Sequence, residues 1–442
     1  MSGESKMDKN VVLKGDCLEE MKKLPANSVD TIITDPPYGL SFMGKKWDYD
    51  VPAVDVWKEC LRVLKPGGTA LIFAGSRTQH RMAVNVEDAG FILKDTIMWF
   101  YGSGFPKATD ISKQLDKGHG RERVLRSVAP IKGGKNHAGG TSGRVMDYIQ
   151  SDVAITEEAK LWNGWKSHGL KPAYEPIIVC MKPNEGTYAA NALKHGVSGL
   201  NIDGGRIGSE GGVKKVSIEE NSANHNGDGF GCNGKLEKLN KGRFPANIIL
   251  DEEAGRLLDE QSGISKTTPR PIADGEKLDK DGNWGFKRMP HNISDKGGAS
   301  RFFYCAKASK GERNAGCEKL EETYNDESRH DKDAIGCNNP RNRSGTAKKN
   351  HHPTVKPLSL MKYLCTLTKT PTGGIVLDPF AGSGTTGVAC ILTDRDYVLI
   401  EREEEYVEII NYRLTHIEEE IEEAITQPLH GTIKTSLDEW GF

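Results

Sequence analysis

Residues 375–386 run Ile-Val-Leu-Asp-Pro-Phe-Ala-Gly-Ser-Gly-Thr-Thr, an apolar triplet followed by a glycine-rich turn and two threonines. The apolar triplet predicts a buried strand, and the threonines suit the start of a helix over 385–393. Glycines at 382 and 384 let the backbone turn tightly and approach a ligand with no Cβ in the way. The stretch therefore predicts a strand–turn–helix unit of an α/β fold.

A candidate nucleotide contact follows this unit. The apolar run 397–400 predicts the next strand, and Glu401 comes directly after it, 19 residues beyond Gly382. In nucleotide-binding α/β folds an acidic residue at this place hydrogen-bonds ribose hydroxyls, while the helix N-terminus offers N–H groups to an anion. Since the pattern is neither G-x-G-x-x-G nor a P-loop, an adenosyl cofactor is favoured over a dinucleotide or ATP. The alternative is an ordinary strand-to-helix turn.

Strands also alternate with helices at the other end of the chain. The predicted strands are 11–13, 29–34, 69–74 and 92–100, and the predicted helices are 18–24, 57–64 and 80–89, with a break at Lys65-Pro66-Gly67-Gly68. A further strand is expected at 176–181 and a further helix at 358–367. This alternation predicts a mostly parallel sheet, covered on both faces and assembled from both ends of the chain.

The tetrapeptide Asp35-Pro36-Pro37-Tyr38 follows the predicted buried strand 29–34. Its prolines fix the backbone, the Asp35 carboxylate and the Pro36 carbonyl can accept two N–H bonds, and Tyr38 offers a face on which a planar base can stack. An aromatic amine is a poor nucleophile because its lone pair is delocalised into the ring. Two acceptors favour a tetrahedral nitrogen whose lone pair can attack a sulfonium methyl group. The alternative is a proline-rich turn with no chemical role.

The tetrapeptide and the downstream glycine turn together resemble the amino-methylating DNA methyltransferases of the N6-adenine/N4-cytosine family. Residues 15–17 and 352–357 resemble two further motifs of that family, and the order of motifs is that of its beta group. Residues 42–48, 101–107 and 301–307 resemble phage and prophage members. The resemblance implies an α/β, Rossmann-like methyltransferase fold with a mixed, mostly parallel seven-stranded sheet and an inserted recognition region.

Site residues follow from the same resemblance. It assigns catalysis and base holding to Asp35, Pro36, Pro37 and Tyr38, and the S-adenosyl-L-methionine (SAM) pocket to Asp16, Thr354, Lys356, Asp378, Phe380, Gly382, Ser383, Gly384, Thr385 and Glu401. The expected substrate is double-stranded DNA, with the target base flipped out of the duplex. Within the family, Asp at the first tetrapeptide position is commoner for adenine N6, which is therefore the expected target. N4-cytosine methylation and RNA amino-methylation stay as alternatives.

The resemblance also divides the chain. The expected segments are a catalytic half at 8–183, a recognition region with a mobile linker at 184–349, a cofactor-binding half at 350–420 and a tail at 421–442. Candidate DNA contacts in the recognition region are Arg206, Lys214, Lys215, Arg243 and Arg256, although each is more commonly a solvated surface charge. Dimerisation occurs in this family, so a homodimer is a further implication. The absence of a nuclease motif favours a standalone modifying enzyme, with a restriction-modification system, a phage and a regulatory circuit as its alternative settings.

Composition excludes several other classes. The 442 residues are 36% hydrophobic and carry a net charge of −2, and no apolar run is long enough to span a membrane. Residues 1–10 lack an apolar signal region, so a cytoplasmic protein is expected. None of the nine cysteines follows a proline, which argues against C5-cytosine chemistry, and none forms a C-x-x-C pair. No metal site is expected. A non-catalytic DNA-binding relative should have an eroded tetrapeptide or turn, and neither is eroded.

Overall fold

The structure is a computed structural model that describes most of the chain. The described residues are 7–40, 48–104, 106–121, 123, 125–127, 148–150, 153–208, 213–217, 234–238, 242–267, 295–307, 311–320 and 349–426. They belong to two compact units, namely unit 1 (residues 1–102 and 174–442) and unit 2 (residues 103–173). Most of the expected mobile linker and most of the tail lie outside the described residues.

Unit 1 is built on a nine-stranded sheet in the order β1-β15-β14-β2-β3-β7-β4-β10-β13. The strands are β1 (Val11–Lys14), β2 (Val29–Thr34), β3 (Leu64–Phe73), β4 (Ile92–Phe100), β7 (Tyr174–Met181), β10 (Ile248–Asp251), β13 (Tyr304–Ala306), β14 (Ile375–Asp378) and β15 (Asp396–Glu401). The α/β class and the mostly parallel sheet are confirmed. The predicted strand number of seven is wrong, because β10 and β13 from the expected recognition region pair in parallel beyond β4.

One strand runs against all the others. β7 is antiparallel to both of its neighbours, β3 and β4, whereas the remaining neighbouring strands pair in parallel. The first residues of β7 therefore lie at the edge of the sheet where the parallel strands have their carboxyl ends. In open α/β sheets this edge is the usual place of ligand sites.

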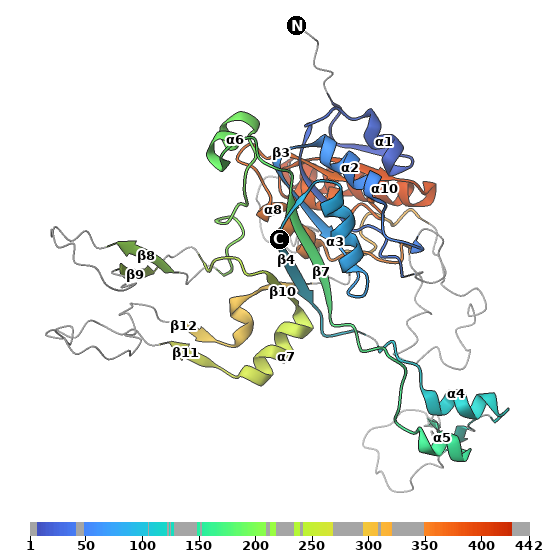
Figure 1. The fold of residues 1–442 in the computed structure, drawn as a ribbon. Helices are drawn as coiled ribbons and strands as arrows, with labels where there is room; N and C mark the ends of the chain where they lie inside the picture. Colours follow the sequence, from blue (N-terminus) through green and yellow to red (C-terminus); the bar gives the residue numbers. More distant parts are fainter. Residues whose placement is uncertain are drawn as a thin grey trace, which may run out of the picture. The chain divides into compact units, whose positions relative to one another are not determined.

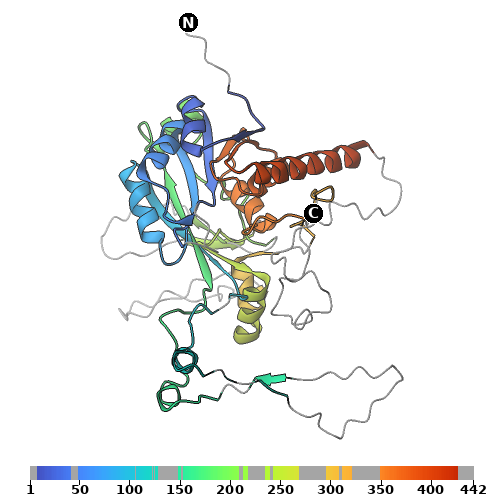
Figure 2. The same cartoon turned by 90° about the vertical axis from the view of Figure 1, so that its right-hand side faces the viewer.

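Helices cover both faces of the sheet, as Figures 1 and 2 show. The helices of unit 1 are α1 (Cys17–Lys23), α2 (Val54–Val63), α3 (Gln79–Asp88), α6 (Tyr188–His195), α7 (Glu252–Ser262), α8 (Leu358–Leu367), α9 (Thr385–Leu392) and α10 (Glu404–Thr426). Helices α1 to α3 pack on one face and α8 to α10 on the other. Neighbouring residues of a strand, such as Ile32 and Ile33, enter opposite cores because side chains alternate across a sheet.

The predicted break at residues 65–68 is part of a strand instead. Helix α2 ends at Val63, and β3 begins at Leu64 and continues through the glycines. The reason is pairing with the end of β7, since Gly67 N donates to Lys182 O at 3.1 Å and Lys182 N donates to Gly68 O at 3.0 Å. Gly67 has a φ of +76°, a conformation that glycine adopts without strain.

Short elements complete both units. The remaining elements of unit 1 are the paired strands β8 (Val213–Ser217) with β9 (Gly234–Lys238) and β11 (Ser265–Thr267) with β12 (Asp295–Gly297), and a 3₁₀ turn at Ala299–Phe302. Unit 2 has α4 (Ile111–Gly118), α5 (Glu157–Leu161) and the paired strands β5 (Leu125–Ser127) and β6 (Tyr148–Gln150). Its buried Asp116 joins the helices, accepting from Thr156 N at 2.9 Å and from Arg123 Nε at 2.7 Å.

Two features are absent from the described residues. None of the described helices has the length and apolar character that a membrane-spanning helix requires. Within the same residues, His, Cys, Asp and Glu side chains nowhere gather in threes in a way that could hold a metal ion.

Candidate active site

The tetrapeptide and the glycine turn leave the sheet side by side. Strands β2 and β14 are parallel neighbours, with Thr31 opposite Val376 and Ile32 opposite Leu377. The last residue of β2, Thr34, donates from Oγ1 to Asp378 Oδ1 at 2.7 Å, although the two residues are 344 positions apart in the chain. The structure therefore brings the two predicted halves of the site to one edge of the sheet.

The backbone after the tetrapeptide is fixed by Asp48, the last residue of the stretch 42–48 that resembles phage and prophage members. Asp48 is 2% exposed, and its carboxylate accepts from the backbone N–H groups of Tyr38 at 2.7 Å, Gly39 at 2.8 Å and Leu40 at 3.2 Å. A carboxylate that accepts several N–H bonds holds a turn firmly. Asp48 therefore positions Tyr38 through its backbone.

Two side chains of the tetrapeptide, Asp35 and Tyr38, meet the side chains of Glu175 and Lys356. Tyr38 Oη donates to Asp35 Oδ1 at 2.6 Å and lies 3.1 Å from Glu175 Oε2. Lys356 Nζ lies 2.7 Å from Asp35 Oδ2 and 3.2 Å from Glu175 Oε2. The ammonium also lies 5.0 Å from the centroid of the Phe73 ring, within range of a cation–π interaction. The expected catalytic residues Asp35 and Tyr38 therefore belong to a compact, charged cluster.

Burial and charge act together in this cluster. Burial raises the pKa of the Asp35 carboxyl above its ordinary value, and the Lys356 ammonium opposes that rise. Burial would lower the pKa of Lys356, but Asp35 and Glu175 raise it above its ordinary value, so the ammonium stays charged. The pKa of Tyr38 is raised by burial and by the two carboxylates, so the phenol keeps its proton and acts as a donor.

On the cofactor side, both glycines of the turn have left-handed backbone. Gly382 has a φ of +55° and Gly384 a φ of +75°. A Cβ at Gly384 would lie 2.9 Å from the Ile410 side chain, and one at Gly382 would lie 2.9 Å from the His352 ring. Glu401 holds the turn from the neighbouring strand, since its Oε2 accepts from Gly382 N at 2.8 Å. Both glycines are therefore required by their left-handed backbone and by the side chains packed against them.

A buried arginine that was not predicted supports the same turn. Arg413 of α10 has no exposed surface, and its Nη1 donates to Ser383 O at 2.6 Å and to Thr385 Oγ1 at 3.0 Å. Burial lowers the pKa of Arg413 to about 10, so the guanidinium is still charged near neutral pH. Helix α10 therefore fixes the glycine turn through a charged hydrogen bond donor.

Asp378 connects the strand ends. It is 2% exposed and accepts from Thr34 Oγ1, from Thr386 Oγ1 at 2.6 Å and from Phe380 N at 3.1 Å. Burial raises the pKa of Asp378 to about 6, although these hydrogen bonds oppose the rise. Both carboxylate oxygens already have partners, so Asp378 lies where it shapes the pocket expected at this edge.

A change of pH is expected to test the burial of Asp378. The folded protein holds this proton up to about pH 6, whereas the unfolded chain releases it near the usual pKa of 3.8. The stabilisation is therefore fully present below pH 3.8 and is lost as pH rises through 6, by about 3 kcal/mol in total. Asp378→Asn, of nearly the same shape, should lack this dependence, so urea unfolding should show the wild type losing stability relative to the variant between about pH 3.8 and 6. A stability difference that does not change with pH would contradict the assignment.

The other expected cofactor residues lie in varied surroundings. Asp16 caps α1 and accepts from Leu18 N at 3.0 Å. Thr354 is exposed, and its N–H lies 3.4 Å from His352 Nδ1. Phe380 is half-buried at the turn. Lys356, which is expected in the cofactor pocket, contacts the Asp35 carboxylate with its ammonium.

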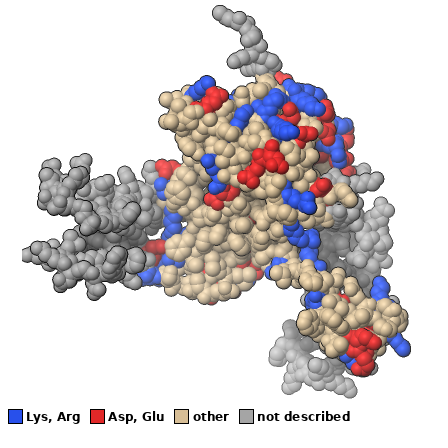
Figure 3. All heavy atoms as spheres, in the orientation of Figure 1, with Lys and Arg blue, Asp and Glu red and all other residues tan. Residues whose placement is uncertain are grey.

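Three of the five residues predicted to contact DNA form ion pairs with acidic side chains of the chain itself. The pairs are Arg206 with Asp203, Arg243 with Asp295, and Arg256 with Glu253 and Glu260. Lys214 and Lys215 lie on β8, where the structure does not describe side chains. On the face of unit 1 drawn in Figure 3, basic and acidic side chains are intermixed. DNA contacts by these five residues stay a prediction.

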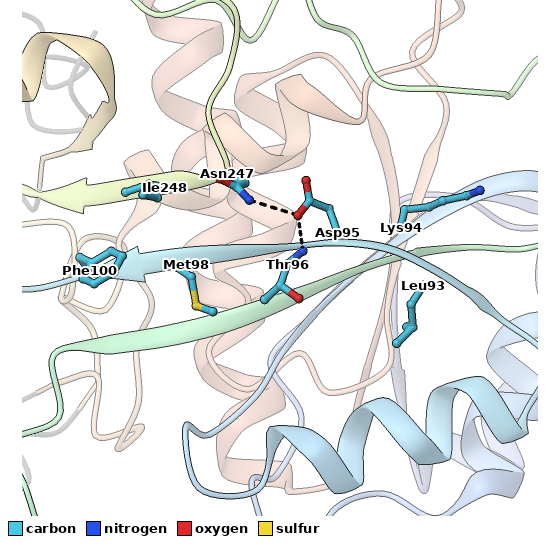
Figure 4. Close-up of a pocket in the computed structure, with 8 residues that line it drawn as sticks. All are labelled: Leu93, Lys94, Asp95, Thr96, Met98, Phe100, Asn247 and Ile248. Carbon is cyan, nitrogen blue, oxygen red and sulfur yellow. Dashed lines mark hydrogen bonds between the residues drawn. The ribbon is translucent and has the colours of Figure 1, made fainter.

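A hollow of about 580 Å³ lies on the sheet beside β4. It is lined by Leu93, Lys94, Asp95, Thr96, Met98, Phe100, Asn247 and Ile248, from β4 and the start of β10 (Figure 4). Asn247 Nδ2 donates to Asp95 Oδ1 at 3.1 Å across it. None of the predicted site residues is among its lining residues, so the chemistry expected of this chain does not map to this hollow.

Known proteins resemble the chain in sequence. The family model N6_N4_Mtase, described as DNA methylase, matches residues 29–412. The type II methyltransferase M.HindIII of Haemophilus influenzae is 26% identical over 257 residues, which are 48% of this chain and 69% of that protein. The type II methyltransferase M2.MboI of Moraxella bovis is 47% identical over 66 residues, but these are only 15% of this chain and 24% of that protein.

Solved structures also resemble the chain. One of them, titled PvuII DNA methyltransferase (cytosine-N4-specific), is 13% identical and is matched over 98% of this chain and 92% of its own. Its TM-score is 0.40, too low to support a functional assignment. The function of this chain is therefore inferred from its sequence family and from the geometry at the sheet edge.

Proposed function

Because the chain belongs to the DNA methylase family whose model covers residues 29–412, we propose that it methylates the N6 amino group of adenine in double-stranded DNA. The family uses SAM as its methyl donor. The observation that carries the proposal is the meeting of β2 and β14, where Thr34 next to the tetrapeptide donates to Asp378 next to the glycine turn. Adenine is favoured over cytosine because the first residue of the tetrapeptide is Asp.

The residues of the glycine turn fit SAM. Gly382 and Gly384 adopt left-handed backbone without strain, which makes the tight turn between β14 and α9 possible. Glu401, at the end of β15, can accept from ribose hydroxyls while it holds Gly382 N. The N-terminus of α9 begins at the same turn and favours a carboxylate, as on the methionine part of SAM.

In this proposal the tetrapeptide prepares the amino group of the flipped base. Asp35 and the Pro36 carbonyl accept its two N–H bonds, which localises the lone pair, and Tyr38 stacks on the ring. SAM, when bound, supplies a methyl group whose bond to sulfur breaks, with both electrons left on sulfur, as the nitrogen lone pair forms the new N–C bond. The nitrogen then carries a positive charge, which Asp35 stabilises until the extra proton passes to this carboxylate and on to water.

Product analysis tests the proposal. Unmethylated genomic DNA is incubated with the protein and SAM, digested to nucleosides and analysed by mass spectrometry. N6-methyldeoxyadenosine is the expected new nucleoside. N4-methyldeoxycytidine would move the target to cytosine, and methylation of RNA oligonucleotides but not of DNA would overturn the choice of substrate.

A further inference from the structure

Each oxygen of the Asp35 carboxylate already has one donor in this structure. Tyr38 Oη donates to Asp35 Oδ1 at 2.6 Å, and Lys356 Nζ donates to Oδ2 at 2.7 Å. Methyl transfer as proposed above requires Asp35 to accept an N–H of the target base. Each oxygen can accept a second bond, but a base that binds while Lys356 stays on Oδ2 meets a carboxylate whose charge is already neutralised. An ammonium that leaves Oδ2 in a buried site needs another acceptor, because an unpaired buried charge is costly.

Glu175 is already placed to be that acceptor. Its Oε2 lies 3.2 Å from Lys356 Nζ and 3.1 Å from Tyr38 Oη. The side chain of Lys356 is 11% exposed and that of Glu175 is 24% exposed, so water screens the pair only in part. The rings of Phe73 and Tyr38 lie 5.0 and 5.5 Å from the ammonium and favour a cation near either carboxylate. A small shift of Lys356 therefore moves it from one acceptor to the other.

The direction of β7 brings Glu175 to this place. Glu175 is the second residue of the antiparallel strand and is paired with Trp99 near the end of β4. It therefore lies at the edge of the sheet where β2 ends and the tetrapeptide begins. Lys356 precedes α8, which begins at Leu358, so Glu175 and Lys356 come from separate parts of unit 1.

We propose that Glu175 is a positioning residue for methyl transfer. When the target amino group binds Asp35, Glu175 becomes the ion-pair partner of the Lys356 ammonium. The inference rests on the proposed function. With Lys356 held by Glu175, that pair is neutral and the negative charge of Asp35 faces the nitrogen that becomes positive during transfer. With Lys356 held by Asp35, the same nitrogen would meet a carboxylate that is already neutralised. Electrostatic stabilisation of developing charge is a large contribution in enzyme catalysis.

Two single variants and their combination test this role. In Glu175→Gln the ammonium has only Asp35 as a charged partner, so kcat should fall by about 10²-fold while SAM binding and DNA binding are unchanged. Lys356→Met leaves two neighbouring carboxylates without a cation, so kcat should also fall. The double variant again has one carboxylate and no competing ammonium, and its kcat should exceed that of either single variant by about tenfold. Glu87→Gln, at an exposed position of α3, is the matched control.

The activity of the double variant distinguishes a positioning role of Glu175 from a purely structural one. If Glu175 and Lys356 only stabilise the structure, the two losses should add, and the double variant should be the least active and the least stable of the series. That result would overturn the inference and leave the proposed function intact, because the wild type and Glu87→Gln would still methylate DNA. A wild type that makes no methylated nucleoside would overturn the proposed function and, with it, the inference.

Discussion

Asp35→Ala is expected to lower kcat for DNA methylation by about 10³-fold or more while SAM binding persists. The variant removes the acceptor that localises the amino lone pair and stabilises the positive nitrogen. Lys356 keeps a charged partner, because Glu175 Oε2 lies 3.2 Å from its ammonium, so the fold should tolerate the change. Transfer of radiolabelled methyl groups to unmethylated genomic DNA measures the rate, and isothermal titration measures SAM affinity.

The matched control for this variant is Asp55→Ala, at an exposed position of α2. It should keep wild-type activity, because Asp55 pairs with the exposed Lys58 and such surface pairs contribute little. Asp35→Ala with unchanged kcat would remove the tetrapeptide from the mechanism. A variant that loses SAM affinity together with activity would instead show that Asp35 supports the cofactor pocket.

Arg413→Met is expected to weaken SAM binding by about tenfold or more and to lower the free energy of unfolding by about 3 kcal/mol. The methionine fills much of the same volume but leaves the Ser383 carbonyl and the Thr385 hydroxyl without their shared donor. These groups are buried, so the loss of a hydrogen bond to a charged partner is costly there. Urea unfolding measures stability, and titration calorimetry on the folded protein measures SAM affinity.

Arg81→Met, at an exposed position of α3, is the control for this second variant and should change neither quantity. Equal SAM affinities for Arg413→Met and Arg81→Met would show that α10 does not fix the glycine turn. A loss of stability without a loss of affinity would give Arg413 a role in the core alone.

The sheet core could be predicted from sequence because its elements carry strong local signals. The strand Val29–Thr34 and the helix Leu358–Leu367 have the bounds that their apolar patterns and flanking prolines predicted. Both are buried along most of their length, so the hydrophobic pattern and the tertiary structure agree. The neighbouring positions of β2 and β14 followed from a resemblance between motifs, since local pattern says nothing about which distant strands pair.

Pairing at the far edge of the sheet could not be predicted for the same reason. Strands β10 and β13 have four and three residues, too few for a periodic signal, and they join the sheet only by pairing beyond β4. Residues 103–173 were assigned to the catalytic half, but their contacts make them a unit of their own. Helix α7 was missed, although Asp251 caps its start and Gly263 follows its end, both of which are helix boundary signals.

Some site residues could likewise be predicted from the sequence and others could not. Asp35 and Gly382 stand in recognisable motifs and are predicted site residues, whereas Glu175 and Arg413 belong to no motif and owe their positions to strand direction and helix packing. A glutamate before Pro176 at the start of the predicted strand was visible in the sequence. Its place at the catalytic edge depends on the antiparallel direction of β7, which nothing in the local sequence specifies.

Methyl transfer as proposed requires one pocket between the tetrapeptide and the glycine turn. A crystal structure of the protein with SAM bound tests this requirement most directly. We expect the ribose at Glu401 and the methyl group directed towards the Asp35 carboxylate, with space between them for an amino group. Electron density for SAM at another place, or with its methyl group turned away from Asp35, would contradict the proposed mechanism.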